Sequence, residues 1–180
     1  MYKISELKEL LKNKKLDDKF SAIYGGDKNS IEEAYLRLLS VSEHFQKIEK
    51  SDNVRIFSAS GWTELSGNHT DHNNGYVLTA SINLDKLTLV SKREDKKIIV
   101  YTDGSNNPDS IDINNLEIDK KEYGKSAALI RGVCAGLINS GYKIGGFTAS
   151  LNNKVLIGSG LSSSASFESL IGEILNSLYN

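Results

Sequence analysis

The amino-acid sequence predicts an α+β fold, with helices packed against a mainly hairpin-connected sheet. Apolar residues recur at helical spacing in three parts of the chain: near its start, in its middle and at its end. Short β-rich runs separated by polar turns fill most of the region between the first and second of these parts. Helices interspersed with hairpin-connected strands are typical of the α+β class.

Length and composition describe an ordinary globular chain. The sequence has 180 residues, of which 39% are hydrophobic, and a formal net charge of -1, so one domain is the default and the charge favours neither nucleic acid nor an anionic membrane as a partner. No apolar run reaches the length of a membrane span, and the start of the chain lacks the apolar core of a signal peptide. The single cysteine, Cys134, excludes an internal disulfide and fits a reducing compartment, so we expect a cytoplasmic protein.

Two helices are predicted in the first 50 residues, with a loop at residues 24–27 between them. The first has apolar residues at helical spacing, namely Ile4, Leu7, Leu10 and Leu11. Ser30 and Glu33 have the spacing of a capping box, with Ser30 as the N-cap of a second helix that continues toward Ile48. We expect the buried face of this helix to consist of Ile31, Ala34, Tyr35, Leu38 and Leu39.

The rest of the chain mixes strands and helices. Strands are predicted at 54–59, 75–84, 86–91, 97–102, 144–151 and 155–157, with a break at 103–108 and weak alternation at 109–119. A helix is predicted at 125–140, and its inner face is expected to be Leu129, Val133, Gly136 and Leu137. Glycines at 132 and 136 suggest close packing of this helix against another element. The last helix presents Phe167, Leu170, Ile171, Ile174, Leu175 and Leu178.

A glycine- and serine-rich stretch precedes the last helix, where residues 157–168 read I-G-S-G-L-S-S-S-A-S-F-E. Two glycines allow a tight turn and a close approach to a ligand, and the start of a helix offers free N–H groups to an anion. The pattern therefore fits a phosphate site, in which a serine hydroxyl could also bind magnesium. It equally fits a loop that only caps the helix. It is not a Walker loop, because no G-K-[ST] closes it.

A second polar cluster, residues 67–75, reads G-N-H-T-D-H-N-N-G and lies between two predicted strands. Nine consecutive small or polar residues cannot form core. They fit either a solvated turn or a sugar site, because carboxylate, amide and imidazole groups at close spacing can bond to vicinal hydroxyls. A zinc site is disfavoured, since His69, Asp71 and His72 have no further good ligand nearby.

Together, these two stretches resemble motifs of the galactokinases, a branch of the GHMP kinase superfamily. The first family motif is commonly written P-G-R-x-N-L-I-G-E-H-T-D-Y, and residues 60–72 read S-G-W-T-E-L-S-G-N-H-T-D-H. The phosphate loop of the family is P-x-G-x-G-L-S-S-S-A-S, and residues 156–166 read L-I-G-S-G-L-S-S-S-A-S. Residues 126–147 also look like the helix and strand that lead to that loop, so the resemblance covers the chain from about Phe20 onward, as the N-terminal portion of a galactokinase.

The resemblance implies a ribosomal protein S5 domain 2-like fold with a mixed sheet. Residues 51–180 would form the galactose- and ATP-binding domain, and residues 1–50 a helical N-terminal extension. The positions that match sugar-contacting residues are Asn68, His69 and Asp71. The positions that match the triphosphate cradle are Gly158, Ser159, Gly160, Leu161, Ser162, Ser163 and Ser164, with Ser164 as the hydroxyl for Mg²⁺. We expect both motifs to face one cleft.

Several positions depart from the family pattern. Trp62 stands where the family has an arginine that stabilises charge at the transferred group, and losing such a charge would cost on the order of a hundredfold or more in rate. Glu64 replaces the motif's asparagine, and Asn68 replaces its sugar-binding glutamate. The family's catalytic aspartate lies beyond the phosphate-loop helix, outside the region matched here, so no catalytic residue is assigned.

Three functions remain open from the sequence. The chain could be a sugar- and ATP-binding domain that lacks the C-terminal half of a kinase and does not turn over alone, which is the reading we expect. It could also act as a sugar kinase that transfers the γ-phosphoryl of ATP to the anomeric hydroxyl of galactose or a related sugar, or as a non-catalytic sugar sensor derived from a kinase. We also expect self-association through an apolar face that the missing half would cover.

Overall fold

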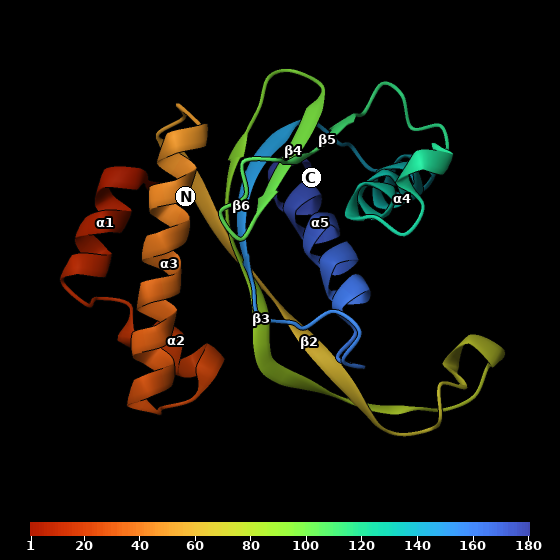
Figure 1. The fold of residues 1–180 in the computed structure, drawn as a ribbon, viewed down its shortest axis with the longest axis horizontal. Coiled ribbons are helices and arrows are strands. Elements are labelled where there is room, and N and C mark those ends of the chain that lie inside the picture. Colours follow the sequence, from red (N-terminus) through yellow and green to blue (C-terminus); the bar gives the residue numbers. More distant parts are fainter.

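A six-stranded mixed sheet forms the middle layer of the computed structural model, which describes all 180 residues, and helices cover both of its faces (Figure 1). The strand order is β1-β2-β3-β6-β4-β5. Neighbouring strands are antiparallel except β4 and β6, which are parallel. The strands are β1 Tyr2–Lys3, β2 Asn53–Ser66, β3 Leu78–Lys92, β4 Lys97–Thr102, β5 Asp109–Asp112 and β6 Phe147–Asn153. The predicted α+β class with a mixed sheet is confirmed.

Three helices lie on one face of the sheet and two on the other (Figure 1). The first group is α1 Ile4–Lys12, α2 Asp17–Tyr24 and α3 Lys28–Ile48, and the second is α4 Ser126–Asn139 and α5 Ser163–Tyr179. Two short 3-10 turns, η1 Asp71–Asn73 and η2 Lys120–Glu122, complete the chain. None of these helices is long and apolar enough to cross a membrane.

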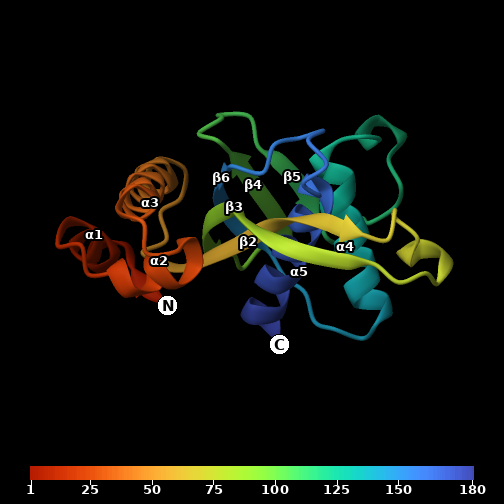
Figure 2. The same cartoon turned by 90° about the horizontal axis from the view of Figure 1, so that it is seen from below.

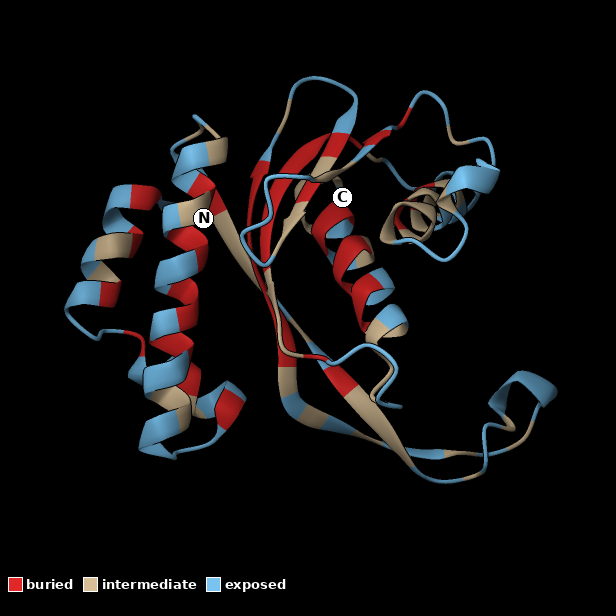
Figure 3. Cartoon of the chain, viewed as in Figure 1, coloured by how far each residue is buried: buried red, intermediate tan, exposed pale blue.

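Each face of the sheet has its own buried cluster. On the α1–α3 side, 14 buried residues include Leu38 and Phe45 of α3 with Leu87 and Leu89 of β3. On the α4–α5 side, 15 buried residues include Val90 of the same strand. Alternate residues of β3 therefore point into different cores, as the two-residue period of a strand requires. Figure 3 shows buried residues along the central strands and on the sides of α3 and α5 that face the sheet. Residues 1–50 thus share a core with the sheet.

The β2–β3 hairpin extends beyond the other strands. Pairing of β2 with β3 runs from Arg55↔Val90 to Ser66↔Leu78, whereas β6 pairs only with the Lys86–Lys92 part of β3. The distal part of the hairpin is therefore a two-stranded ribbon. Its tip projects at the opposite end of the molecule from helices α1–α3 (Figure 1, Figure 2).

Helix α3 differs from its prediction at the start and on its buried face. Its N-cap is Asp27, whose carboxylate accepts a hydrogen bond from the main-chain N–H of Ser30 at 2.9 Å, so the predicted Ser30 cap is wrong. Leu39 is exposed, because the buried stripe follows Leu38 and Val41 instead. A residue one position after the stripe is rotated by about 100° away from it.

The predicted strands at 75–84 and 86–91 are one continuous strand, β3, because buried side chains from other elements bind Asp85. Residues 155–157, in contrast, form a loop and not a strand. Helix α2 is an element that periodicity did not predict, since only Phe20 and Tyr24 are buried in it.

In α4 the inner face is built on Ile130 and Cys134. Three predicted members of that face, Leu129, Val133 and Leu137, are partly buried against the same cluster. No atom of another element lies within 4 Å of a Cβ placed on Gly132 or Gly136, so the predicted close packing at these glycines is wrong.

Candidate functional site

The loop between β6 and α5 has the backbone of an anion-binding turn. Gly158 and Gly160 both have φ of 74°, the left-handed region that glycine adopts without strain. Ser162 also has a positive φ, 56°, and is the N-cap of α5, where its side chain makes no capping hydrogen bond. Left-handed geometry at a non-glycine residue costs of order 1–3 kcal/mol and is concentrated at functional sites.

The N–H groups of this loop are free. No main-chain N–H from Leu156 to Ser162 donates a hydrogen bond within the protein. The first turn of α5 adds further N–H groups that no helical carbonyl can accept. Free donors at the positive end of a 17-residue helix are the donor set that binds phosphate oxygens.

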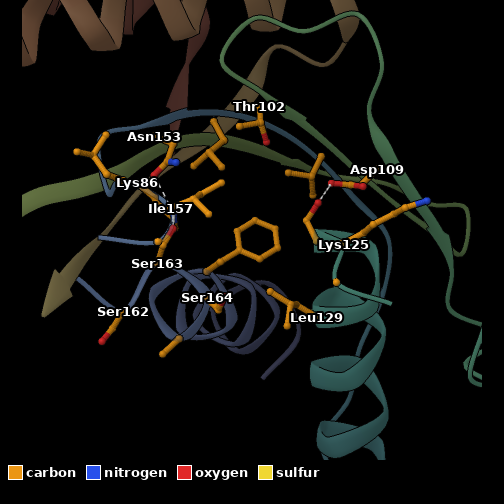
Figure 4. A pocket seen from close by; sticks show the side chains of 18 of the residues that line it. Lys86, Thr102, Asp109, Lys125, Leu129, Asn153, Ile157, Ser162, Ser163 and Ser164 are labelled. Carbon is orange, nitrogen blue, oxygen red and sulfur yellow. Dashed lines mark hydrogen bonds between the residues drawn. The ribbon is translucent and has the colours of Figure 1, made fainter. Parts of the chain in front are cut away.

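A cavity of about 940 Å³ lies against this loop (Figure 4). Its walls come from the loop itself and the start of α5, from strands β3, β4 and β6, and from the beginning of α4. Charged groups in the lining are Lys86, Lys125 and Asp109, and the Asp109 carboxylate accepts a hydrogen bond from the Ser126 hydroxyl. The lining therefore carries more positive than negative charge, which suits an anionic ligand.

Lys86 is a residue of the candidate site that the sequence did not predict. Its side chain is only 3% exposed, and its Nζ donates hydrogen bonds to Asn153 Oδ1 at 2.8 Å and to Ser163 Oγ at 3.0 Å. Burial lowers the pKa of this lysine below its usual value, an effect that the negative charge of Asp103 partly opposes. The signal available in the sequence was the pair Asp85-Lys86 inside an otherwise apolar run.

The neighbouring Asp85 points to the opposite face of the sheet, where it is fully compensated. Arg37 Nη1 donates to Asp85 Oδ1 at 2.7 Å, and the hydroxyls of Tyr24 and Ser58 donate to Oδ2 at 2.7 and 2.6 Å. Burial and the Asp85 charge raise the pKa of Tyr24. This network joins α2, α3, β2 and β3, and it gives the Asp85 carboxylate a counter-charge and two further donors.

The predicted sugar residues lie at the tip of the β2–β3 hairpin. Asn68, His69 and Asp71 are all exposed, and the first two have positive φ values of 54° and 55°. Glu64 holds the loop, because its Oε1 accepts the main-chain N–H of His69 at 2.9 Å and its Oε2 lies 3.3 Å from His69 Nδ1. The close packing of Gly75 against Thr70 leaves no room for a side chain at Gly75.

The two predicted motifs do not meet in this cavity. None of Asn68, His69 and Asp71 lines the cavity beside the 156–164 loop, so this cavity is not the common cleft that the sequence predicted. The motifs are instead connected through β2. Trp62 N–H donates to the carbonyl oxygen of Leu161 at 3.3 Å, and a Cβ placed on Gly61 would lie 2.8 Å from the same oxygen. The Ser166 hydroxyl also donates to the carbonyl oxygen of Ala59 at 3.1 Å.

No group of three or more His, Cys, Asp or Glu side chains in the structure could hold a metal ion. The exposed hydroxyl of Ser164 lines the cavity, and Asp109 is its only carboxylate. A magnesium ion here would therefore take most of its ligands from a phosphate-bearing ligand and from water, as Mg²⁺ does in many nucleotide sites.

Comparison with known proteins identifies relatives for most of the chain. Residues 43–92 match the galactokinase galactose-binding signature. A galactokinase of Lactococcus lactis is 34% identical over 145 residues, which are 79% of this chain and 36% of the relative. A galactokinase of Pyrococcus furiosus is 39% identical over 120 residues, or 67% of this chain and 32% of the relative.

Solved structures agree with these relatives. The crystal structure of Lactococcus lactis galactokinase complexed with galactose superposes with a TM-score of 0.72 at 33% identity, covering 79% of this chain and 37% of that one. Methanococcus jannaschii mevalonate kinase superposes with a TM-score of 0.57 at 19% identity, which shows a shared fold. The chain spans about a third of the length of these galactokinases. By signature, sequence and fold, the chain is homologous to the N-terminal portion of the galactokinases of the GHMP kinase superfamily.

Proposed function

We propose that this chain binds ATP with Mg²⁺ at the 156–164 loop and galactose or a related sugar at the tip of the β2–β3 hairpin. In a complete kinase the two ligands would exchange a phosphoryl group, from the γ-position of ATP to the anomeric hydroxyl of the sugar. The observation that supports this best is the row of free N–H groups from Leu156 to Ser162, placed beside a cavity with a positive lining.

In this proposal the phosphate oxygens accept hydrogen bonds from the loop N–H groups. Gly158 and Gly160 allow the left-handed turns that expose these groups, and a Cβ would meet no atom within 4 Å at either position. The Ser164 hydroxyl would contribute a ligand to Mg²⁺, which would offset the charge of the phosphates. Phosphoryl transfer depends mainly on positioning and on charge stabilisation, which is the kind of chemistry that such a loop can support.

The sugar would be bound by polar side chains on the hairpin tip. Asn68, His69 and Asp71 carry amide, imidazole and carboxylate groups that can bond to adjacent hydroxyls. Glu64 supports the proposal, because it fixes the left-handed backbone at His69. A sugar bound there would reach the nucleotide only if other residues completed the site between them.

We further propose that this chain does not turn over by itself. Trp62 lies beside the loop, where galactokinases have an arginine, and an indole cannot stabilise charge on a transferred phosphoryl group. A non-catalytic sugar sensor is the alternative that Trp62 favours.

We also propose that the protein is cytoplasmic and that it self-associates. Three large apolar side chains on the hairpin, Leu65, Tyr76 and Leu78, are exposed and could contact a second copy.

Calorimetry and a coupled ADP-release assay test these proposals together. We expect heat of binding with galactose and with ATP·Mg²⁺, and no turnover above background when both are present. D71N should weaken binding of galactose alone, and G160A should weaken binding of ATP alone. H72A is the control, because His72 is an exposed neighbour outside the proposed set. If the folded protein fails to bind ATP·Mg²⁺ or fails to bind galactose, the proposed function is refuted. Release of ADP above background with both ligands present would refute the claim of inactivity.

A further inference from the structure

Asp85 and Lys86 are adjacent charged residues of β3, but only Asp85 has a side chain of opposite charge within ion-pair distance. Asp85 points toward the α1–α3 face and is neutralised by Arg37. Lys86 points toward the α4–α5 face, and no carboxylate lies within 4 Å of its Nζ. Both side chains are buried. The opposing charge that acts on Lys86 is that of Asp103, which lies beyond ion-pair distance. A buried ammonium without a close counter-charge is costly, and a bound anion would offset that cost.

The hydrogen bonds of Lys86 connect the two ends of the 156–164 loop, which we call the anion loop. Its partner Asn153 is the last residue of β6, and Asn153 Oδ1 also accepts the N–H of Val155 at 3.0 Å. Its second partner, Ser163, is the first residue of α5, and the Ser163 hydroxyl donates to the carbonyl oxygen of Val155 at 3.1 Å. One ammonium group therefore holds the residues that enter and leave the loop.

These bonds use two of the three N–H groups of Lys86. The remaining N–H and the full positive charge stay available beside a loop whose own N–H groups are free. The cavity lining has one other cation, Lys125, which is exposed. Solvent and salt screen an exposed charge far more than a buried one, so Lys86 should contribute most of the attraction for an anion.

We propose that Lys86 fixes the loop in its binding conformation and supplies the positive charge that selects a polyphosphate. This inference rests on the proposed nucleotide site and makes it specific. The site favours ligands by their phosphate chain, so it should bind ATP and inorganic tripolyphosphate far more tightly than adenosine. Ser163 and Asn153 are positioning residues in this arrangement, because they act through Lys86.

Calorimetry with three probes, ATP, sodium tripolyphosphate and adenosine, tests this proposal on the wild type and on K86M, K86R and K125M. We expect K86M to lose at least tenfold in affinity for both polyphosphates while adenosine is unaffected. K86R should stay within a few fold of the wild type, and K125M should change less than K86M. Equal tripolyphosphate affinity in the wild type and K86M overturns the inference. A wild type that binds no ATP instead refutes the proposed function itself.

The pH dependence of tripolyphosphate binding tests the role of Lys86 even if K86M does not fold. Because burial lowers the pKa of Lys86, tripolyphosphate affinity of the wild type should fall as the pH rises toward 10.5, the usual value for lysine. K86R remains charged over this range, so its affinity should change less. A purely structural role for Lys86 predicts the same pH profile for both proteins, and coinciding profiles would overturn the inference.

Discussion

The main-chain N–H of Trp62 donates a hydrogen bond to the carbonyl oxygen of Leu161, with 3.3 Å between the two atoms. This bond joins the strand that carries the galactokinase signature to the loop that resembles the phosphate loop. The contact is possible because Gly61, the preceding residue, has no side chain to hold the loop away. The main chain of β2 therefore helps to position the loop.

Replacing Gly61 with alanine should displace the anion loop. The new Cβ would lie 2.8 Å from Leu161 O and 2.9 Å from Val155 Cγ1, closer than such atoms can approach. We expect G61A to weaken ATP binding about tenfold or more and to lower the free energy of unfolding by about 1–3 kcal/mol, as overpacking usually does. G132A is the matched control, since Gly132 is helical with open space around it and the change should stabilise by up to about 1 kcal/mol. Unchanged ATP affinity in G61A would contradict the role of this contact.

Removing Arg37 should destabilise the protein strongly. Arg37 and Asp85 form an ion pair at 2.7 Å with side chains only 9% and 2% exposed, so R37M would leave a buried carboxylate without its counter-charge. Loss of one partner of a buried pair costs about 3–5 kcal/mol, whereas R37M/D85N should lose less than R37M alone. K14M is the control, because Lys14 and Glu32 form an exposed pair worth about 0–1 kcal/mol. Urea unfolding measures all three, and a small effect of R37M would show that water reaches Asp85.

Stability should fall in mild acid because of His44. Its Nδ1 lies 2.9 Å from Ser150 Oγ, while its Nε2 is buried without a partner. Burial, with a smaller effect from Lys47, lowers the pKa of His44 in the folded protein, so the unfolded chain binds a proton at a higher pH. The free energy of unfolding should therefore decrease as the pH falls below about 6.5, and level off below the folded pKa. Unfolding at pH 7.5 and 5.5 should show a smaller pH effect in H44Q than in H72Q; equal effects would exclude His44 as the cause.

Truncating Glu64 should loosen the hairpin tip. Its Oε1 accepts the N–H of His69, which has a left-handed backbone, and this bond contributes about 1 kcal/mol to holding that conformation. We expect E64A to weaken galactose binding several fold without changing ATP affinity, because the tip does not line the nucleotide cavity. E64Q keeps an acceptor for the same N–H and should bind galactose nearly as well as the wild type. Equal loss in the two variants would assign the effect to charge instead.

The sequence predicted elements whose own residues carry a clear period. The buried stripes of α1 and α5 follow the expected apolar spacing closely, and β4 occupies the predicted residues 97–102. Helix α2 escaped prediction because two buried residues in eight make no distinct pattern. The continuity of β3 also escaped, because Asp85 and Lys86 look like a polar break until their distant partners are known.

The candidate site, like the fold, was predicted only where the signal is local in the sequence. Gly158 and Gly160 signalled the turn of the anion loop because glycine chemistry is local. Lys86 could not be predicted as part of it, since its partner Ser163 lies 77 positions further along the chain. The absence of His69 from the loop's cavity was also not predictable: how far the hairpin projects from the sheet depends on where β6 stops pairing with β3.

The burial of strand β3 on both faces determines which of its positions tolerate mutation. All seven positions from Asp85 to Ser91 are buried, because helices cover both sides of the sheet there. In a sheet with one solvent-exposed face, saturation mutagenesis would find tolerant and intolerant positions in alternation along each strand. In this protein, saturation mutagenesis should find every position from Asp85 to Ser91 intolerant of substitution. Tolerance should return in the two-stranded part of the hairpin.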